Sequence, residues 1–516
     1  MFRGRLPLMG LFLAFLLGFC PGTLSAAAPD WRSKVDPWVL DRTGAASAQT
    51  EFIVFLAEQA DVSAAADLPT KAAKGRYVFE KLSATAARTQ GPVLAELGRR
   101  GLEHRPYWVA NMIWVKGSQA DVQALAERSD VARIAANPTV RLDATQPVAE
   151  LDFTHAPTAV EPGVTKVGAP TFWAQGYTGQ NIVVGGQDTG YDWDHPALKN
   201  QYRGWDGATA DHNYNWHDSI HSGGGVCGPN SVLPCDDSSH GTHTMGTMVG
   251  DDGGTNQIGV APGARWIGCR NMNQGDGTPT TYSECFQFFL APTDLTNSNP
   301  DPLKSPHVIN NSWGCPPSEG CTDPLVLQTV VENTRAAGIV VVVSAGNSGS
   351  GCSSVSTPAA IYDASFTVGA TDNNDIIAGF SSRGPVTVDG SNRLKPDITA
   401  PGVSVRSSVP GTGYGPNSGT SMAGPHVAGV VAVMLSASPG LVGDQDALEQ
   451  CLTTTAAGLT SAQTCGGVPG SNIPNNTFGH GRVALVWPLN AACTASNIFD
   501  DGFESGDTSA WTQVVP

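Results

Sequence analysis

The segment SGTSMAGPHVAG, residues 418–429, decides how the rest of the chain is interpreted. Its central serine, Ser421, lies between small residues that let another part of the molecule approach the backbone closely. The apolar run from Val427 to Leu435 predicts a buried helix with Ser421 near its first turn. Free N–H groups and the helix dipole favour negative charge there, so an oxyanion would be stabilised. A serine at a helix start is more often a cap, and other segments must decide between the two interpretations.

Three apolar runs upstream each end in polar residues with catalytic potential. Residues 181–184 lead to Asp188, residues 307–310 lead to the NSWG segment at 311–314, and residues 339–343 lead to the SAGN segment at 344–347. Short unbroken apolar runs that alternate with helices favour a buried parallel sheet. Sites in such folds lie beyond the carboxyl ends of the strands. The sequence therefore predicts an α/β fold with an active site at that edge.

Nucleophilic acyl transfer needs a nucleophile, a base within hydrogen-bond reach and a carboxylate that orients the base. Ser421, His240 in SSHGTHTMGTMVG and Asp188 in GGQDTGYDWDHP supply these three groups. Asn347 adds a side-chain amide that could stabilise an oxyanion. Alone, Ser421 would be interpreted as a cap, Asp188 as a turn or cap residue and Asn347 as a turn residue. Together, and at strand ends, they favour catalysis.

At these residues the chain resembles the subtilisin-like serine proteases. The matching segments are DTGYDWDHP, HGTH, VINNSWG, VVVSAGNSG and GTSMAGPHVAG, which follow that family's order between about 165 and 490. The resemblance implies a three-layer fold with a mainly parallel sheet. It implies that Asp188 orients the base, that His240 is the general base and then acid, and that Ser421 is the nucleophile. The Asn347 amide and the Ser421 backbone N–H would bind the oxyanion. A closer likeness is to the bacillopeptidase F group, carried by CFQFFLAPTD at 285–294, DHNYNWHD at 211–218 and HTMGTMVG at 243–250.

The same resemblance implies two sets of substrate-binding residues. The set that pairs with the substrate backbone is Ser312, Trp313 and Gly314. The set that lines the first pocket is Ser344, Ala345 and Gly346. The pocket set is small and carries no acid, so we expect uncharged or apolar side chains before the cut.

The N-terminal part predicts export and a separate small domain. Arg3 and Arg5 precede an apolar stretch and then small residues, as in a secretory signal peptide. Residues 50–145 alternate strand and helix and predict a small α+β (ferredoxin-like) unit, whose expected elements are strands at 51–56, 108–115, 131–134 and 140–142 and helices at 71–90, 93–99 and 119–128. This unit resembles the family's inhibitory prodomain. We expect a signal peptide at 1–27, an inhibitory and chaperone prodomain at 28–145, a catalytic domain at 146–490 and an acidic tail at 491–516.

These observations predict a secreted serine endopeptidase, extracellular or periplasmic, that is made as an autoprocessed zymogen and acts through an acyl-enzyme. Its partners would be protein or peptide substrates and its own prodomain, and we expect a monomer. The formal net charge of −17 argues against nucleic acid or an anionic membrane surface as partner. Self-cleavage is expected within residues 143–163 or just before them.

Ten of the 11 cysteines follow residue 226, and their even number in an exported chain indicates disulfides. Close neighbours suggest four pairs, although spacing does not fix the connectivity: Cys227–Cys235, Cys269–Cys285, Cys315–Cys321 and Cys451–Cys465. This leaves Cys352 with Cys493.

No metal or other cofactor is expected in the chemistry. Where many family members carry a calcium-binding Asp this chain has Ala197, so a structural calcium ion stays an open alternative. A zinc hydrolase is a second function class, because five histidines lie within 32 positions: His212, His217, His221, His240 and His243. However, the HEXXH motif of zinc peptidases is absent. A catalytically silent binding protein is a third.

Overall fold

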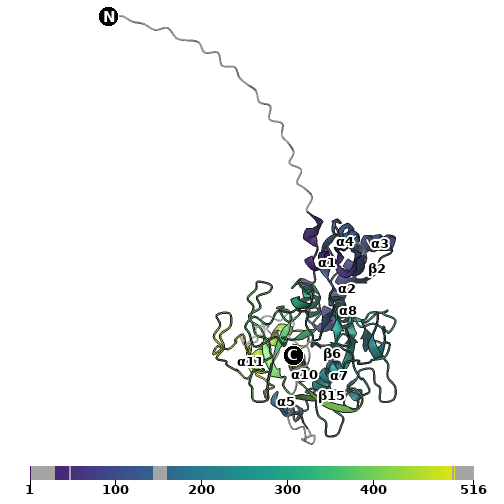
Figure 1. Ribbon diagram of the computed structural model, residues 1–516. Coiled ribbons are helices and arrows are strands. Elements are labelled where there is room, and N and C mark those ends of the chain that lie inside the picture. Colours follow the sequence, from purple (N-terminus) through teal and green to yellow (C-terminus); the bar gives the residue numbers. More distant parts are fainter. Residues whose placement is uncertain (2–29, 46–47, 143–159, 491–492, 494–516) are drawn as a thin grey trace, which may run out of the picture.

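The computed structural model describes residues 1, 30–45, 48–142, 160–490 and 493. The predicted signal peptide, most of the expected linker and nearly all of the acidic tail lie outside the described residues. The described chain forms a smaller N-terminal unit that sits on a larger unit at the position of helix α8 (Figure 1).

The larger unit is built on a seven-stranded sheet in the order β14-β13-β12-β11-β6-β8-β7. Every pairing in it is parallel. The strands are β6 (Val183–Asp188), β7 (Trp216–Asp218), β8 (Arg265–Arg270), β11 (Val308–Asn311), β12 (Val340–Ser344), β13 (Phe366–Thr371) and β14 (Ile398–Pro401). The α/β class and the buried parallel sheet predicted from the three apolar runs are confirmed.

Helices cover both faces of this sheet, so its strands are buried on each side. Two separate apolar clusters lie against the sheet, one holding α7 and α10 and the other holding α8 and α9. The helices are α5 (Pro162–Lys166), α6 (Ala169–Trp173), α7 (His240–Val249), α8 (Pro279–Leu290), α9 (Gln328–Ala336), α10 (Thr420–Ala437) and α11 (Gln445–Thr455). A hairpin of β15 (Val405–Val409) and β16 (Gly413–Asn417) packs against α7. Short 3-10 helices occupy Trp31–Lys34, Ser63–Ala65, Lys199–Gln201, Gly225–Cys227, Pro302–Lys304, Pro317–Glu319 and Pro439–Leu441.

Helix α10 is the central helix of the larger unit. Among the described helices it alone is long and apolar enough to cross a membrane, but 89% of that stretch is buried inside the protein. Its first residues include Ser421, as the segment at 418–429 predicts. The apolar run is therefore a core helix that holds Ser421 at the edge of the sheet.

The N-terminal unit has the βαββαβ order and a four-stranded antiparallel sheet, β2-β3-β1-β4. Its elements are α1 (Pro37–Thr43), β1 (Gln49–Leu56), α2 (Lys71–Thr89), α3 (Gly91–Arg100), β2 (Glu103–Tyr107), β3 (Met112–Ser118), α4 (Gln119–Ala126) and β4 (Val131–Ala136). The strand predicted at 108–115 begins at Met112, because residues 108–111 form the turn of a hairpin. The sequence did not predict β2, which contains Pro106 and is an edge strand, where proline is tolerated.

The two faces of this small sheet have different partners. Phe52 and Val54 on one face belong to the unit's own core with helices α3 and α4. Ile53 and Phe55 on the other face join the cluster of α8 and α9 in the larger unit. The alternation of the apolar strand β1 therefore builds one core inside the unit and one across the contact between the two units.

The expected strand at 140–142 does not complete the N-terminal sheet. Instead, β5 (Val140–Arg141) pairs antiparallel with β10 (Asp276–Gly277) of the larger unit, and β10 also pairs with β9 (Met272–Asn273). The backbone N–H of Leu142 donates to the carbonyl of Gly275 at 2.7 Å. The end of the N-terminal unit is thus an added strand on the larger unit.

Five disulfides are present, and three of the five predicted pairs are confirmed: Cys227–Cys235, Cys269–Cys285 and Cys315–Cys321. The other two predicted pairs are wrong. Cys451, on α11, bonds Cys493 in the core beside α10, and Cys352 bonds Cys465. The loop after β12 lies against the loop around Cys465, where Gln463 donates to the carbonyl of Ser350. Tertiary packing therefore decided these pairs against proximity along the chain.

Candidate active site

A buried carboxylate and an imidazole form the first part of the site. Asp188 ends strand β6, and His240 begins helix α7. His240 Nδ1 donates to Asp188 Oδ1 at 2.7 Å, and the two side chains are only 3% and 1% exposed. Asp188 also accepts bonds from the backbone N–H of Thr189 and, more weakly, from the Thr244 hydroxyl at 3.3 Å. Three donors therefore stabilise a carboxylate that would otherwise be costly to bury.

The state of His240 is set by opposing effects. Burial lowers the pKa of His240, but the carboxylate of Asp188 raises it, and the net result is a pKa above the ordinary histidine value. Nε2 of the same ring is buried and has no hydrogen-bond partner among the residues that the structure describes. The ring is therefore held in one tautomer, with an unoccupied nitrogen that can take a proton.

A second buried acid, Asp236, positions this pair and was not predicted from the sequence. It accepts bonds from the hydroxyl and backbone N–H of Thr242 on α7 and from the hydroxyl of Thr189 after β6. Burial raises the pKa of Asp236 despite these donors. Gly190 is required beside it, because a Cβ there would lie 1.8 Å from the Cys235 carbonyl oxygen. The sequence signal that could have identified Asp236 is its position two residues before the SSHGTH segment.

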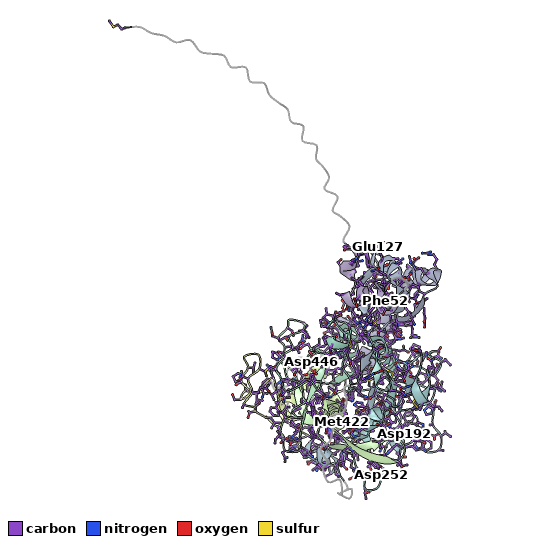
Figure 2. The ribbon with its side chains drawn as sticks, in the orientation of Figure 1. Phe52, Glu127, Asp192, Asp252, Met422 and Asp446 are labelled. Carbon is purple, nitrogen blue, oxygen red and sulfur yellow. A yellow bond between two sulfur atoms is a disulfide. The ribbon has the colours of Figure 1, made fainter. Side chains whose placement is uncertain are left out.

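Ser421 lies in the first turn of α10, next to the buried Met422, which is labelled in Figure 2. Its hydroxyl donates to the carbonyl of Ser312 at 3.3 Å, and the Ser312 hydroxyl donates to the Ser421 carbonyl at 3.0 Å. This reciprocal pair ties the start of α10 to the segment after β11. The Ser421 hydroxyl is not hydrogen-bonded to His240 among the described residues; it donates to Ser312, and His240 Nε2 is unpaired.

Asn347, in the loop after β12, is fixed by its amide oxygen. Asn347 Oδ1 accepts bonds from the backbone N–H and the hydroxyl of Thr420, both at 2.9 Å. Because the oxygen is occupied by Thr420, the amide nitrogen is the end that remains available beside Ser421. A hydrogen-bond donor and the helix N-terminus therefore meet at the same place.

Ser421 and Asn347 border a cavity of about 150 Å³ that both units line. Of the residues predicted to bind substrate, those that line it are Ser312, Trp313, Gly314, Ser344 and Gly346, together with Asn347 and Ser421. Ala345 does not line it; this residue is buried and donates its N–H to Val368. Trp313 stacks on Tyr282 with ring centroids 3.9 Å apart. Arg141 and Leu142 of the N-terminal unit and Glu319 also line the cavity, and the sequence did not predict them there.

The five histidines of the zinc alternative do not converge on one site. His212 bonds Tyr202, His217 and His221 bond Glu284, and His243 bonds two backbone carbonyls, while His240 bonds Asp188. Across the described ranges, no group of three or more His, Cys, Asp or Glu side chains could hold a metal ion. Ala197 is buried and supplies no side-chain oxygen, and its carbonyl accepts from the backbone N–H of Asp251.

Comparison with known proteins assigns the chain to a family. Residues 179–481 match the model of the subtilase family, so the chain belongs to that family of serine peptidases. It is 38% identical to bacillopeptidase F of Bacillus subtilis over 83% of the chain, which covers 30% of that protein. It is 34% identical to subtilisin E of Bacillus subtilis over 56% of the chain and 65% of that protein. A subtilisin of Bacillus pumilus is 34% identical over 56% of the chain and 90% of that protein.

Proposed function

We propose that this protein is a secreted serine endopeptidase that cleaves peptide bonds through Asp188, His240 and Ser421 and is made as a self-processing zymogen. The observation that carries the proposal is the buried Asp188–His240 hydrogen bond, with Nε2 of the ring left for a serine hydroxyl. The relatives named subtilisin and bacillopeptidase F support the same chemistry.

In the proposed mechanism the Ser421 hydroxyl exchanges its bond to Ser312 for one to His240 Nε2. His240 takes the proton as the oxygen attacks the carbonyl carbon of the substrate, and it then gives this proton to the departing amine. Asp188 holds the ring in the required tautomer and stabilises the imidazolium. The Asn347 amide and the backbone N–H of Ser421 bind the oxyanion, and water then hydrolyses the acyl-enzyme.

The zymogen part of the proposal rests on residues 140–142. They lie as an added strand in the cleft that Ser421 borders, so the end of the N-terminal unit occupies the path of a substrate. Several contacts hold the unit in place: Gln287 of α8 accepts from the N–H groups of Trp108 and Val109, and Tyr107 donates to Glu284 at 2.8 Å. Since Arg141 and Leu142 line the same cavity as Ser421, we place the self-cleavage C-terminal to Leu142.

The test compares the intact masses of the purified wild-type product, Ser421→Ala and Ser436→Ala. Ser436 lies on the same helix and donates to the Val433 carbonyl, so its variant controls for loss of a serine from α10. We expect wild type and Ser436→Ala to lose the N-terminal unit and Ser421→Ala to keep it. A serine-directed phosphonate should label Ser421 in the mature enzyme, and a chelator should leave the initial rate unchanged. Identical trimming of all three proteins would refute self-processing, and an unlabelled, inactive mature chain would refute the peptidase assignment.

A further inference from the structure

A pair of acidic side chains flanks the part of the cleft that β5 occupies. Asp276 belongs to β10, the strand to which β5 is added, and Glu319 belongs to the loop closed by the Cys315–Cys321 disulfide on the other side. Neither residue takes part in the proposed chemistry. We propose that they form an acidic subsite that selects substrates with a basic side chain at the position of Arg141, and that Glu319 also binds the substrate backbone. This inference rests on the proposed function.

The position of Asp276 follows from strand register. Arg141 and Asp276 are directly opposite in the antiparallel pair, and Arg141 Nε donates to Asp276 Oδ1 at 3.2 Å. Directly opposite residues in an antiparallel pair place their side chains on the same face. Any substrate strand that adopts this register therefore places one side chain beside Asp276, whatever its sequence.

Glu319 contacts the same strand through the backbone. The backbone N–H of Arg141 donates to Glu319 Oε2 at 3.1 Å. The loop that carries Glu319 is fixed, because Cys315 and Cys321 are buried and enclose Val140, the residue before Arg141. A carboxylate that accepts a substrate N–H lies close to the side chain of that same residue, so it adds negative charge at this position.

Solvent limits the size of the effect. The side chain of Arg141 is 79% exposed and that of Asp276 is 37% exposed, so water and salt screen their attraction. Exposed ion pairs contribute up to about a five-fold change in an equilibrium constant. We therefore expect kcat/KM to differ about ten-fold between Arg and Glu at this substrate position at low salt, since two acids attract one and repel the other.

The experiment uses the mature enzyme obtained from the full-length chain and peptides copied from residues 137–149, NPTVRLDATQPVA. The variant peptides replace the arginine that corresponds to Arg141 with Lys, Ala or Glu. A further peptide exchanges this arginine with the threonine two positions before it, which preserves net charge. Mass spectrometry identifies the bond cut, and active-site titration with the phosphonate normalises the rates.

Three enzyme variants separate charge from backbone binding. Asp276→Asn and Glu319→Gln remove charge but keep an acceptor oxygen, while Glu319→Ala removes the acceptor as well. Asp446→Asn, which changes a 93% exposed acid on α11, has the same net charge as the single charge variants and controls for the overall negative field.

The expected order for wild type is Arg and Lys above Ala above Glu, with a lower rate for the exchanged peptide. The spread, meaning the ratio of kcat/KM for the Arg peptide to that for the Glu peptide, should shrink toward two-fold in 0.5 M salt. Asp276→Asn and Glu319→Gln should each reduce the spread to about three-fold, and Asp446→Asn should leave it unchanged. Glu319→Ala should raise KM about three-fold even for the Ala peptide.

Equal rates on the Arg and Glu peptides would overturn the inference, as would an unchanged spread in both single charge variants. A spread that Asp446→Asn reduces equally would also overturn it, because the whole surface would then be responsible. Casein hydrolysis distinguishes these results from failure of the proposed function: an enzyme that digests casein without charge preference lacks the subsite, whereas one that digests neither casein nor peptide is not the proposed peptidase.

Discussion

Replacement of Asp188 by Asn tests the buried pair at the centre of the site. The amide has nearly the shape of the carboxylate but no charge. Its oxygen can still accept from His240 Nδ1 and from the N–H of Thr189. Its NH₂ would then face Thr244, whose hydroxyl has the carbonyl of Gly241 as a second acceptor at 3.0 Å. The variant should therefore fold, although the reverse orientation of the amide would turn NH₂ toward the ring.

The two orientations have different catalytic consequences. With the oxygen toward the ring, His240 keeps its tautomer but loses a negative charge 2.7 Å away that stabilises the imidazolium. Two unit charges about 4 Å apart interact by about 4 kcal/mol at an effective dielectric constant of 20, which corresponds to about a thousand-fold loss of rate. With NH₂ toward the ring, Nε2 carries the proton and the base is lost. We expect a reduction of about 10³–10⁴ overall, in line with the loss known for this change in another serine protease family.

The assay is the first-order rate at which the refolded precursor cleaves itself, followed across pH on denaturing gels. The base must be neutral, and the pKa of His240 is raised, so the wild-type rate should rise with pH through a midpoint above the ordinary histidine value. Asp188→Asn should move this midpoint below that of wild type and lower the plateau. Thermal unfolding of the Ser421→Ala and Asp188→Asn precursors, each changed at one residue of the proposed triad, controls for folding.

Self-cleavage of Asp188→Asn within ten-fold of the wild-type plateau would refute this reasoning. An unchanged midpoint with a low plateau would refute the electrostatic part alone, because Asp188 would then act only through orientation.

Three further changes follow from individual contacts. Asn347→Ala should lower kcat about 10²–10³-fold with little change in KM, the loss known for one oxyanion donor in a subtilisin, as steady-state kinetics will show. Loss of the disulfide in a Cys451→Ala, Cys493→Ala enzyme should destabilise it by about 4 kcal/mol, because the bridge closes a loop with a sequence separation of 42; chemical denaturation of the mature enzyme measures this. Tyr107→Phe removes the hydrogen bond to Glu284 and should shorten the lag between self-cleavage and casein hydrolysis about ten-fold, with unchanged kinetics once the lag is over.

The sequence predicted the sheet and the parts of the site that lie at strand ends, because both depend on local patterns. Apolar runs predicted β6, β11 and β12, and the polar residues after two of these runs identified Asp188 and Asn347 as candidates. Ser312, after the third run, was implied by the resemblance to the subtilisin-like proteases. Asp236 escaped prediction because its importance comes from contacts with Thr189 and Thr242, which are brought together only by the fold.

The predictions of strand and disulfide pairing failed where a segment could pair with more than one part of the chain. The sequence around Val140 favours a strand, but nothing local shows whether it joins the N-terminal sheet or β10. The same holds for Cys451, which has Cys465 nearby in sequence and Cys493 nearby in space. Strand propensity and loop length are local, whereas the partner is set by packing over the whole molecule.

The contacts of the N-terminal unit explain why a cut after Leu142 need not free the cleft at once. Strand β5 itself adds two paired residues, whereas the sheet of this unit buries Ile53 and Phe55 against α8 and α9. That apolar contact does not depend on the covalent link, so the cleaved unit should continue to block the cleft. All five disulfides lie in the larger unit. After self-cleavage the N-terminal unit is therefore held by packing and hydrogen bonds, without a covalent cross-link. It is the part whose unfolding would end the proposed inhibition while the cross-linked larger unit survives.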